Sequence, residues 1–477
     1  SALAILMCAA MLIGATFAWF TDTASTGVNK IVSGNLKVDI IGADSDSHIE
    51  KLNFTKAATT DAEAGAEILW EPGCRYLTEG FRIANKGNLA LKWKAQVNTG
   101  TTAANEGNFD LLDVIDFYLV TKAADGTETE TALDEFTGNL KKTETSDVYY
   151  IKGVMQTTAG NDYQGLTLDG ISITVVATQD TVESDSFDNQ YDKDAEYPIL
   201  VTTGDELQAI VSNATAPVNI VLTNSITTNN FVIPEDKDVT LDLNGRTVTN
   251  AGSHTILNKG HLTLTDSSAD KSGQIISLKG NTAALRNGDN AVCVVEGGTI
   301  SRDGANGNTW HVVENFGKMT FNGGKVVLKN GNGFAITNGW NYFDPGASTT
   351  HAVMEINALE LDTDSSGIKN CRYGDLTVND VTVTSTGYWA LSNDYLGTAV
   401  INGGTLTSNS FKAVSNGAAM TVNGGTFDGT QGFFVQSYAT STVLNGGTFA
   451  NMNVDALSSY VGTGHTAQQS GTSVIIK

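Results

Sequence analysis

Basic residues are scarce in this 477-residue sequence. It contains 28 lysines and arginines against 52 aspartates and glutamates, which gives a formal net charge of −24 at pH 7. A surface of this charge repels nucleic-acid phosphates and anionic lipids, so we expect no nucleic-acid binding and no electrostatic docking to a membrane. Such a balance fits a soluble secreted protein better.

Cysteine is also rare, with four residues in the chain. Cys8 lies in a segment that we expect to be removed, and the remaining Cys74, Cys293 and Cys371 are an odd number with neither zinc nor redox spacing. We therefore expect buried free thiols instead of a disulfide framework. Runs of strong helix formers are few, whereas Thr, Val and Asn are abundant and 50 residues are Gly, so the composition indicates β structure.

The N-terminus carries an apolar run without charge, residues 2–18. It is short for a membrane span and matches the core of a signal peptide, so residues 1–18 are predicted to be one. Because the sequence opens at Ser1 without Met or a basic start, we expect this peptide to be truncated at its beginning. Thr16 and Ala18 suit a cleavage site between Ala18 and Trp19, after which no membrane attachment is expected. A retained anchor helix is the alternative.

A short phrase recurs in the C-terminal half, as in "VINGGTL" and "TVNGGTF" (400–406 and 421–427). An apolar residue is followed by Asn or Glu, and four positions after that comes a second apolar residue. The last three steps between these polar residues are 23, 21 and 22 positions, by subtraction of their sequence numbers. This pattern of an apolar residue, Asn or Glu, and a second apolar residue four positions later is called the frame below. Its Asn or Glu lies at Glu296, Asn322, Asn357, Asn379, Asn402, Asn423 and Asn445.

A second phrase, an apolar residue two positions before Asn, precedes each copy of the first. A period near 22 residues that is built from two short β segments is the signature of a solenoid. Leucine-rich repeats would need Leu-rich phrases and a helix, so we predict a right-handed parallel β-helix in which stacked asparagines form ladders and Gly pairs supply corners with positive φ. The second phrase ends at Asn287, Asn315, Asn338, Asn370, Asn393 and Asn416, with Val435-x-Ser437 as a variant.

The entry to this half, residues 203–226, contains an expected helix cap at Thr203 or Asp205, an amphipathic turn and then a strand, and the segments 239–248 and 262–268 follow. A short amphipathic helix here would close the first coil. These segments resemble the N-terminal coils of right-handed β-helix proteins of the pectate-lyase-like superfamily. The resemblance covers about residues 197–477 and implies the fold of a domain at 198–477, not its activity.

Many proteins of that superfamily cleave polysaccharides, so catalysis has to be weighed. The hydrolases resemble one another in clustered Asp residues and a Gly-His-Gly turn, but here Gly260-His261 is followed by Leu and no aspartate pair accompanies it. Arg286, Arg302 and Arg372, candidates for a lyase base, are scattered among the coils. The sequence favours a non-catalytic scaffold, with a polysaccharide lyase or glycoside hydrolase as the alternative.

Two smaller sites are predicted in the repeats. The segment "DTDSSG" (362–367) begins like a calcium loop, with Asp362, Asp364 and Ser366 as oxygen donors, but Tyr373 occupies the position of the bidentate Glu, so a turn is favoured over weak calcium binding. Phe334, Trp389 and Phe433 fall in the frame of the core. The aromatics outside that frame are candidates for sugar stacking: Trp310, Trp340 and Tyr342.

The front half lacks the Asn-Gly-Gly phrase and instead has alternating segments at 34–41, 80–97, 114–120 and 168–179. Such strands indicate a β-sandwich or jelly roll at 19–182, and Lys86-Gly87 would form a hairpin or a sheet-crossing kink. The acidic segment 183–197 lacks alternation and is predicted to be a linker. The overall prediction is an all-β chain with two domains.

Three segments of the front half, 14–40, 71–93 and 161–179, resemble the TasA/camelysin family of secreted proteins that are processed by a SipW-type signal peptidase. The resemblance implies export from a Gram-positive bacterium and a role in extracellular fibres or biofilm matrix. Camelysin is described as a metalloprotease, but His-Glu-x-x-His is absent and His48 is the only histidine before residue 197. We expect no resident cofactor.

These observations favour a secreted structural or adhesive protein of a cell surface or biofilm matrix. The mature chain would begin with two aromatics and a Thr-rich segment, residues 19–30, that could complete the sheet of a neighbouring copy. Such head-to-tail pairing does not close, so self-association into filaments is one expected partner interaction and an extracellular glycan is the other. Pairing of this segment within its own domain is the alternative.

Overall fold

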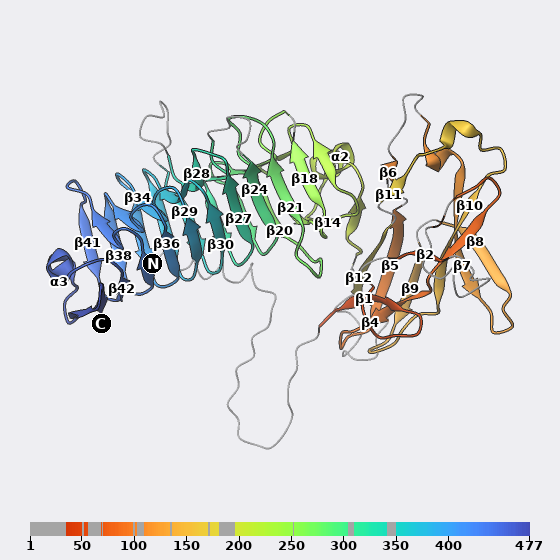
Figure 1. The fold of residues 1–477 in the computed structure, drawn as a ribbon, viewed down its shortest axis with the longest axis horizontal. Coiled ribbons are helices and arrows are strands. Elements are labelled where there is room, and N and C mark those ends of the chain that lie inside the picture. The colour runs from red at the N-terminus through yellow and green to blue at the C-terminus, as the bar shows by residue number, and fades with distance from the viewer. Residues whose placement is uncertain are drawn as a thin grey trace, which may run out of the picture.

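The computed structural model confirms the predicted all-β fold, with 49% of residues in strands and 6% in helices. It describes residues 35–49, 52–55, 68, 70–98, 101–102, 109–133, 136–169, 172–180, 196–250, 252–303, 310–340 and 350–477. The predicted signal peptide, its predicted cleavage site and most of the predicted linker lie outside these residues, and so does Tyr342. A sandwich precedes a long parallel β-solenoid (Figure 1).

The sandwich consists of two antiparallel sheets that enclose a core around Trp93, Phe81 and Ile151. In the first sheet β10 pairs with β7 along one edge and with β3 and β4 along the other. Its strands are β1 (Val38–Gly42), β2 (Phe54–Thr55), β3 (Arg75–Thr78), β4 (Phe81–Asn85), β7 (Ile115–Lys122), β8 (Glu128–Ala132) and β10 (Tyr149–Met155). The second contains β5 (Leu91–Asn98), β9 (Phe136–Leu140) and β12 (Ser172–Gln179).

The remaining sandwich elements are short: β6 (Thr101–Thr102), β11 (Leu168–Asp169), and the 3₁₀ helices η2 (Leu111–Asp113) and η3 (Asn161–Tyr163). The segment around Lys86 and Gly87 is a sheet crossing and not a hairpin, because β4 and β5 belong to different sheets. Asn85 is buried at this corner. Its Nδ2 donates to the Leu89 carbonyl at 2.7 Å and its Oδ1 accepts from Gly87 N at 2.9 Å.

The solenoid has about 10 turns, and three strands per turn stack into three parallel sheets. Sheet I contains β13 (Ile199–Val201), β14 (Val218–Leu222), β17 (Asp238–Asp242), β20 (His261–Thr265), β23 (Val292–Val295), β26 (Lys318–Phe321), β29 (Ala352–Ile356), β32 (Gly374–Val378), β35 (Thr398–Ile401), β38 (Ala419–Val422) and β41 (Ser441–Leu444).

Sheet II contains β15 (Ile226–Thr228), β18 (Thr247–Asn250), β21 (Gln274–Ser277), β24 (Thr299–Asp303), β27 (Lys325–Lys329), β30 (Glu360–Thr363), β33 (Thr382–Ser385), β36 (Thr405–Ser408), β39 (Thr426–Asp428), β42 (Gly447–Phe449), β43 (Ala467–Ser470) and β44 (Ser473–Ile476). Sheet III contains β16 (Val232–Ile233), β19 (Ile256–Asn258), β22 (Leu285–Asn287), β25 (Val313–Asn315), β28 (Phe334–Asn338), β31 (Ser366–Asn370), β34 (Leu391–Asn393), β37 (Val414–Asn416) and β40 (Phe433–Val435).

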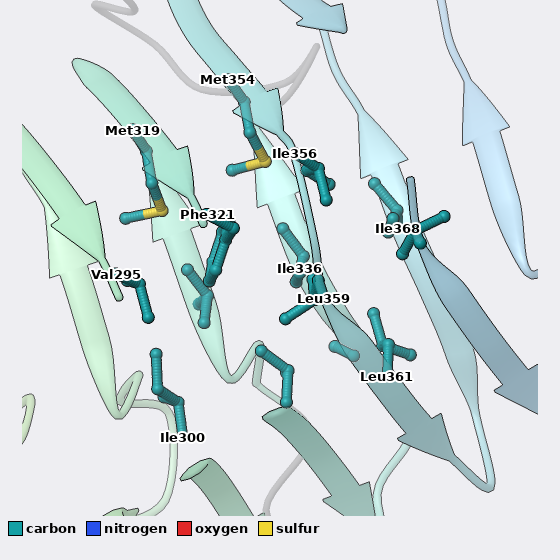
Figure 2. Packing of buried hydrophobic residues seen from close by; sticks show 14 of the residues in the cluster. Val295, Ile300, Met319, Phe321, Ile336, Met354, Ile356, Leu359, Leu361 and Ile368 are labelled. Carbon is teal, nitrogen blue, oxygen red and sulfur yellow. The ribbon is translucent and has the colours of Figure 1, made fainter. Parts of the chain in front are cut away.

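Stacked apolar residues fill the interior of the solenoid. Along sheet I, Val295, Phe321 and Ile356 lie above one another, and Ile300 and Leu361 face them from sheet II (Figure 2). All seven second apolar positions of the sequence frame are buried. In the corner between sheets I and II the second Gly of the pair has positive φ, for example +99° at Gly404 and +110° at Gly425, which a side chain would strain.

The asparagines of the two phrases form two stacks. Those at the end of sheet III are buried and bond from turn to turn through side-chain amides, as Asn315 Nδ2 does to Asn338 Oδ1 at 2.7 Å. This stack runs through Asn258, Asn287, Asn315, Asn338, Asn370, Asn393 and Asn416. The stack between sheets I and II is more exposed and joins Glu296, Asn322, Asn357, Asn379, Asn402, Asn423 and Asn445.

The register of the last coil differs from the one that the sequence suggests. Val414 pairs with Phe433, and Asn416 pairs with Val435, so Val435-x-Ser437 is not the variant of the second phrase. Phe433 takes the apolar position because its larger side chain fills the core beside Phe449, with ring centres 5.7 Å apart. The buried asparagine stack therefore ends at Asn416, whose Nδ2 donates to Thr442 Oγ1 at 2.8 Å.

Both ends of the solenoid are covered (Figure 1). At the first turn lies α2 (Gly204–Asn213), capped by Thr203, whose side chain accepts from Glu206 N, and it buries Leu207 and Val211. At the last turn lie α3 (Val454–Leu457), the 3₁₀ helix η4 (Ser458–Tyr460) and the antiparallel pair β43–β44. These elements keep water from the apolar interior and cover the open strand edges.

A small interface joins the sandwich to the first turns of the solenoid. Val176 of β12 packs against Leu200, Val221 and Tyr197. Two side-chain hydrogen bonds flank this cluster: Asn98 Nδ2 donates to the Thr223 carbonyl at 3.2 Å and Arg246 Nη2 donates to Ser172 Oγ at 3.1 Å.

Candidate functional site

The outer face of sheet III carries an unusual mixture of side chains. Each strand presents one outward residue between its buried apolar residue and its buried Asn, and a second side chain lies at the corner just before the strand. The outward residues of successive turns are Arg286, Glu314, Thr337, Lys369, Ser392, Ser415 and Phe434. Corner residues include His311, Trp389 and Lys412, and Phe334 is the first residue of β28. Cations and aromatic rings thus gather on one face of an acidic protein.

Cations on this face lie over aromatic rings. The Arg286 guanidinium is 4.6 Å from the centre of the Phe316 ring, and the Lys369 ammonium is 5.1 Å from that of Phe334. Lys412 Nζ lies 3.2 Å from the centre of the Phe434 ring. Such contacts favour one orientation of both partners. They help to hold the half-buried rings of Phe334 and Phe434, whereas Phe316 is buried and packs against Trp340.

A buried charge cluster lies at the start of the face. Glu314, with a side chain 4% exposed, accepts from Arg286 Nη1 at 3.0 Å. Burial raises the pKa of Glu314, and the Arg286 charge limits that rise. Arg302 is 1% exposed, and burial lowers its pKa to about 10. Its Nη1 donates to the His311 carbonyl at 3.1 Å, whereas Nε and Nη2 have no partner in the described structure.

Two histidines near this cluster are held neutral. Burial lowers the pKa of His254 to about 4, and the charge of Arg286 adds to the effect. Burial does the same for His311, with Lys369 and Arg302 as the nearby charges. Each Nδ1 accepts a backbone hydrogen bond, from Ala283 N at 2.8 Å in His254 and from Phe334 N at 3.1 Å in His311. Both imidazoles therefore act as structural acceptors at neutral pH.

The arginines that the sequence seemed to scatter are brought together in part. Arg286 donates a hydrogen bond to Glu314, and the charges of Arg286 and Arg302 both lower the pKa of its carboxyl against the effect of burial. Arg372 lies apart from them, with its guanidinium 4.7 Å from the centre of the Tyr373 ring. Arg286 pairs with Glu314 of the next coil, and Arg302 belongs to sheet II in the coil of Glu314, so arginines of two different coils act on one carboxyl.

Of the proposed sugar-stacking residues, the structure describes Trp310 and Trp340, and their role in sugar stacking stays a prediction. Trp310 is half-buried beside His311, with ring centres 5.6 Å apart, and Trp340 packs on Phe316 at 4.5 Å. Phe334 and Trp389, expected in the core, are half-buried on the outside, and only Phe433 is in the core. Trp389 lies two positions before Leu391, the first residue of the short strand β34, so it falls in a corner, whereas Phe334 is the first residue of β28.

The predicted calcium donors point to different partners. Asp362 lies on the outer side of β30 and its Oδ1 is 2.7 Å from Lys329 Nζ, while Asp364 Oδ2 accepts from Asn330 N at 2.6 Å. Ser366 begins β31 and is buried. The described residues contain no group of three or more His, Cys, Asp or Glu side chains that could hold a metal ion. Weak calcium binding there stays a prediction.

An open groove of about 310 Å³ lies beside Asp362 on the outer face of sheet II. It is lined by Lys325, Glu360, Leu361, Asp362, Thr382 and Thr384. Its two carboxylates are paired with lysines, Glu360 with Lys325 at 3.7 Å and Asp362 with Lys329 at 2.7 Å. Paired, solvated carboxylates are poorly suited to exchange a proton with a sugar at neutral pH.

Sequence reasoning missed the buried charge cluster, although the repeat contained a signal for it. Arg302 pairs with Ser277 in the preceding coil and with Leu328 in the next, so it occupies an inward column of small or apolar residues. A charged residue in such a column departs from the repeat. The residues Phe411, Lys412 and Phe434 were also missed, because corners carry no periodic pattern.

Comparisons with protein-family models, curated proteins and solved structures find no match to this chain. In the part of the chain that the structure describes, no helix is long and apolar enough to span a membrane. The fold and the outer face of sheet III therefore define a two-domain parallel β-solenoid protein with a cationic and aromatic surface.

Proposed function

We propose that the protein is a secreted structural or adhesive protein of a bacterial cell surface or biofilm matrix. The sandwich serves assembly or attachment, and the solenoid presents a long surface to extracellular glycans. The observation that carries this proposal is the outer face of sheet III, where rings are fixed on a rigid rod by cations and by the asparagine stack beneath. Rigid aromatic side chains with polar neighbours suit the apolar faces of sugars.

The resemblance of residues 14–40, 71–93 and 161–179 to the TasA/camelysin family supports the assembly role and export from a Gram-positive bacterium. A secreted protein would begin at Trp19 after cleavage, and its first residues would be free to add a strand to a neighbouring copy. Mature protein and a form that lacks residues 19–30 should be compared by electron microscopy and light scattering. Filaments are expected from the first form alone, and equal polymerisation of both would exclude this route.

The structural role is tested by incubating the purified full chain with pectins, alginates and host glycans. We expect binding without release of reducing or unsaturated sugar ends. Catalytic release of such ends would overturn the proposal.

A polysaccharide lyase or glycoside hydrolase is the alternative, and one observation favours it. Glu314 has a raised pKa, is bonded to the Arg286 guanidinium and is influenced by the charge of Arg302, a combination that could donate a proton and bind an acidic sugar. If this alternative holds, Glu314→Gln should abolish product release while leaving the unfolding midpoint close to that of the wild type. A wild-type protein without product release on any of these substrates would remove it.

A further inference from the structure

We infer that a cluster of aromatic residues on turns seven to nine binds an uncharged linear polysaccharide. The cluster, called the aromatic ridge below, consists of Tyr388, Trp389, Phe411 and Phe434 together with Lys412. It is distinct from Trp310 and Trp340, and it lies at the far half of the sheet III face. This inference rests on the proposed adhesive function and names the class of its ligand.

The rings of the ridge contact one another at the corner between sheets II and III. Trp389 and Phe411 meet edge to face, with centres 5.0 Å apart and planes at 89°. Tyr388 lies 5.9 Å from Phe411 and is 55% exposed. Lys412 Nζ bridges Phe411, at 5.7 Å, and Phe434, at 3.2 Å. Edge-to-face packing fixes the planes of Trp389 and Phe411, and the exposed ring of Tyr388 stays open to a ligand.

The backbone beneath the ridge is tied to the rungs of the solenoid. Tyr388 N donates to the Ser365 carbonyl at 3.0 Å, and the Trp389 carbonyl accepts from Gly367 N at 2.9 Å. The Phe411 carbonyl accepts from Thr430 N at 2.9 Å. These three residues are thus fixed to neighbouring coils, as is Phe434 through its pairing with Ser415, so a ligand would not have to order a flexible loop there. A preorganised surface loses less entropy on binding.

The chemistry of the ridge favours sugar rings as the ligand. The pyranose ring has an apolar face of C–H groups that can stack on an aromatic ring, and hydroxyls around its edge that need polar partners. Exposed polar side chains adjoin the rings in sequence: Asn409 and Ser410 precede Phe411, and Thr430 precedes the strand of Phe434. The coils repeat about every 4.8 Å, so a pyranose unit of about 5 Å spans about one coil. A linear chain parallel to the solenoid axis can therefore contact several coils at once.

Charge favours a neutral chain over a polyanion. The protein carries a net charge of −24, which repels a polyuronate or a polyphosphate at long range. The ammonium of Lys412, the cation of the ridge, is already held over Phe434 and contributes to fixing that ring. Uncharged polysaccharides meet no such repulsion, and their affinity should change little with salt.

The test uses the full chain and soluble oligosaccharides of increasing length: uncharged β-linked gluco-, xylo-, manno- and chito-oligosaccharides, with oligogalacturonate as the acidic arm. Isothermal titration is carried out at low and high salt. At least one uncharged series should bind, with an affinity that rises with length and is insensitive to salt. Removing a stacking ring should weaken binding about ten-fold or more, so we expect this loss for Tyr388→Ala and for Phe434→Ala.

The conservative variants Tyr388→Phe and Phe434→Tyr keep the rings and should bind within about three-fold of the wild type. Leu278→Ala, at a position 56% exposed and away from the ridge, is the matched control and should bind normally. Failure of every uncharged series, binding of oligogalacturonate alone, or unchanged affinity in both alanine variants would overturn the inference. None of these outcomes contradicts the proposed structural role. That role is contradicted by a different observation, the release of reducing or unsaturated sugar ends.

Discussion

Buried asparagines are the residues on which the solenoid most depends for its regular spacing. Asn338 accepts from Asn315 in one neighbouring coil and donates to Asn370 Oδ1 at 2.9 Å in the other. Its Nδ2 also lies within bonding distance of the Ala352 and Asp375 carbonyls, at 3.3 and 3.2 Å. One side chain thus satisfies polar groups of several coils where water cannot reach.

We expect Asn338→Ala to lower the free energy of unfolding of the solenoid by about 3 kcal/mol, because it leaves buried acceptors and a donor without partners. Asn402→Ala removes the same type of stack at an exposed corner, where water replaces the lost amide, and should cost about 1 kcal/mol or less. Urea unfolding of both variants measures the difference. Equal losses of unfolding free energy would show that burial does not determine how much these hydrogen bonds stabilise the solenoid.

The neutral histidines make stability depend on pH. The pKa of His311 is lowered to about 4 from an ordinary 6.5, so the unfolded chain binds more protons between these values. The contribution of His311 is therefore complete above pH 6.5 and is lost as the pH falls towards 4. Its effect on the unfolding free energy has a limiting slope of about 1.4 kcal/mol per pH unit.

Replacement of His311 by Asn keeps an acceptor near Phe334 N and removes the titrating group. We expect a smaller loss of stability between pH 6.5 and 4.5 in this variant than in the wild type, measured as the urea midpoint at each pH. His261→Asn, at an exposed position on β20, is the control and should follow the wild type. Parallel curves for wild type and His311→Asn would contradict the proposed protonation.

At the scale of strands and helices, the repeated phrases predict most of the solenoid. An Asn or Glu at the corner and an apolar residue four positions later recur in the seven frames from Glu296 to Asn445, so stacking in register there follows from the sequence. Val435 shows a limit of this prediction. Phe433 and Val435 are both apolar, so the sequence pattern alone does not tell which of them enters the core. Trp389 and Phe411 show another limit, because corners have no period that separates inside from outside.

The helix α2 is predicted to hold the first coil closed. Its residues Leu207 and Val211 are fully buried. Leu207→Ala should therefore lower the free energy of unfolding of the solenoid by about 2–5 kcal/mol, because apolar burial is lost and a cavity remains. Ala209→Ser changes the exposed side of the same helix and should have an effect within about 0.5 kcal/mol. Thermal and urea unfolding compare the two. A Leu207→Ala protein as stable as the control would mean that the helix does not support the core.

At the scale of the whole molecule, the two domains meet through few residues. The contact consists of Val176 against Leu200, Val221 and Tyr197, with hydrogen bonds at its edges, which is small beside the interior of either domain. Since each domain has its own core, the interface can orient the domains without being needed for their folding. The direction in which the aromatic ridge points relative to an attached sandwich therefore depends on a handful of side chains.

Val221 provides the sharpest test of this dependence. It lies on the outer side of β14 and is 8% exposed, next to Val176 in the domain contact. Val221→Asp should place an unpaired carboxylate in that contact and so separate the domains. The distribution of molecular dimensions in small-angle X-ray scattering should then broaden. Both unfolding midpoints should remain near the wild-type values, because neither core is altered. Asn219→Asp introduces the same carboxyl group two residues earlier at an exposed position and should scatter like the wild type. If the Val221→Asp profile matches that of Asn219→Asp, contacts other than this apolar cluster must fix the orientation of the domains.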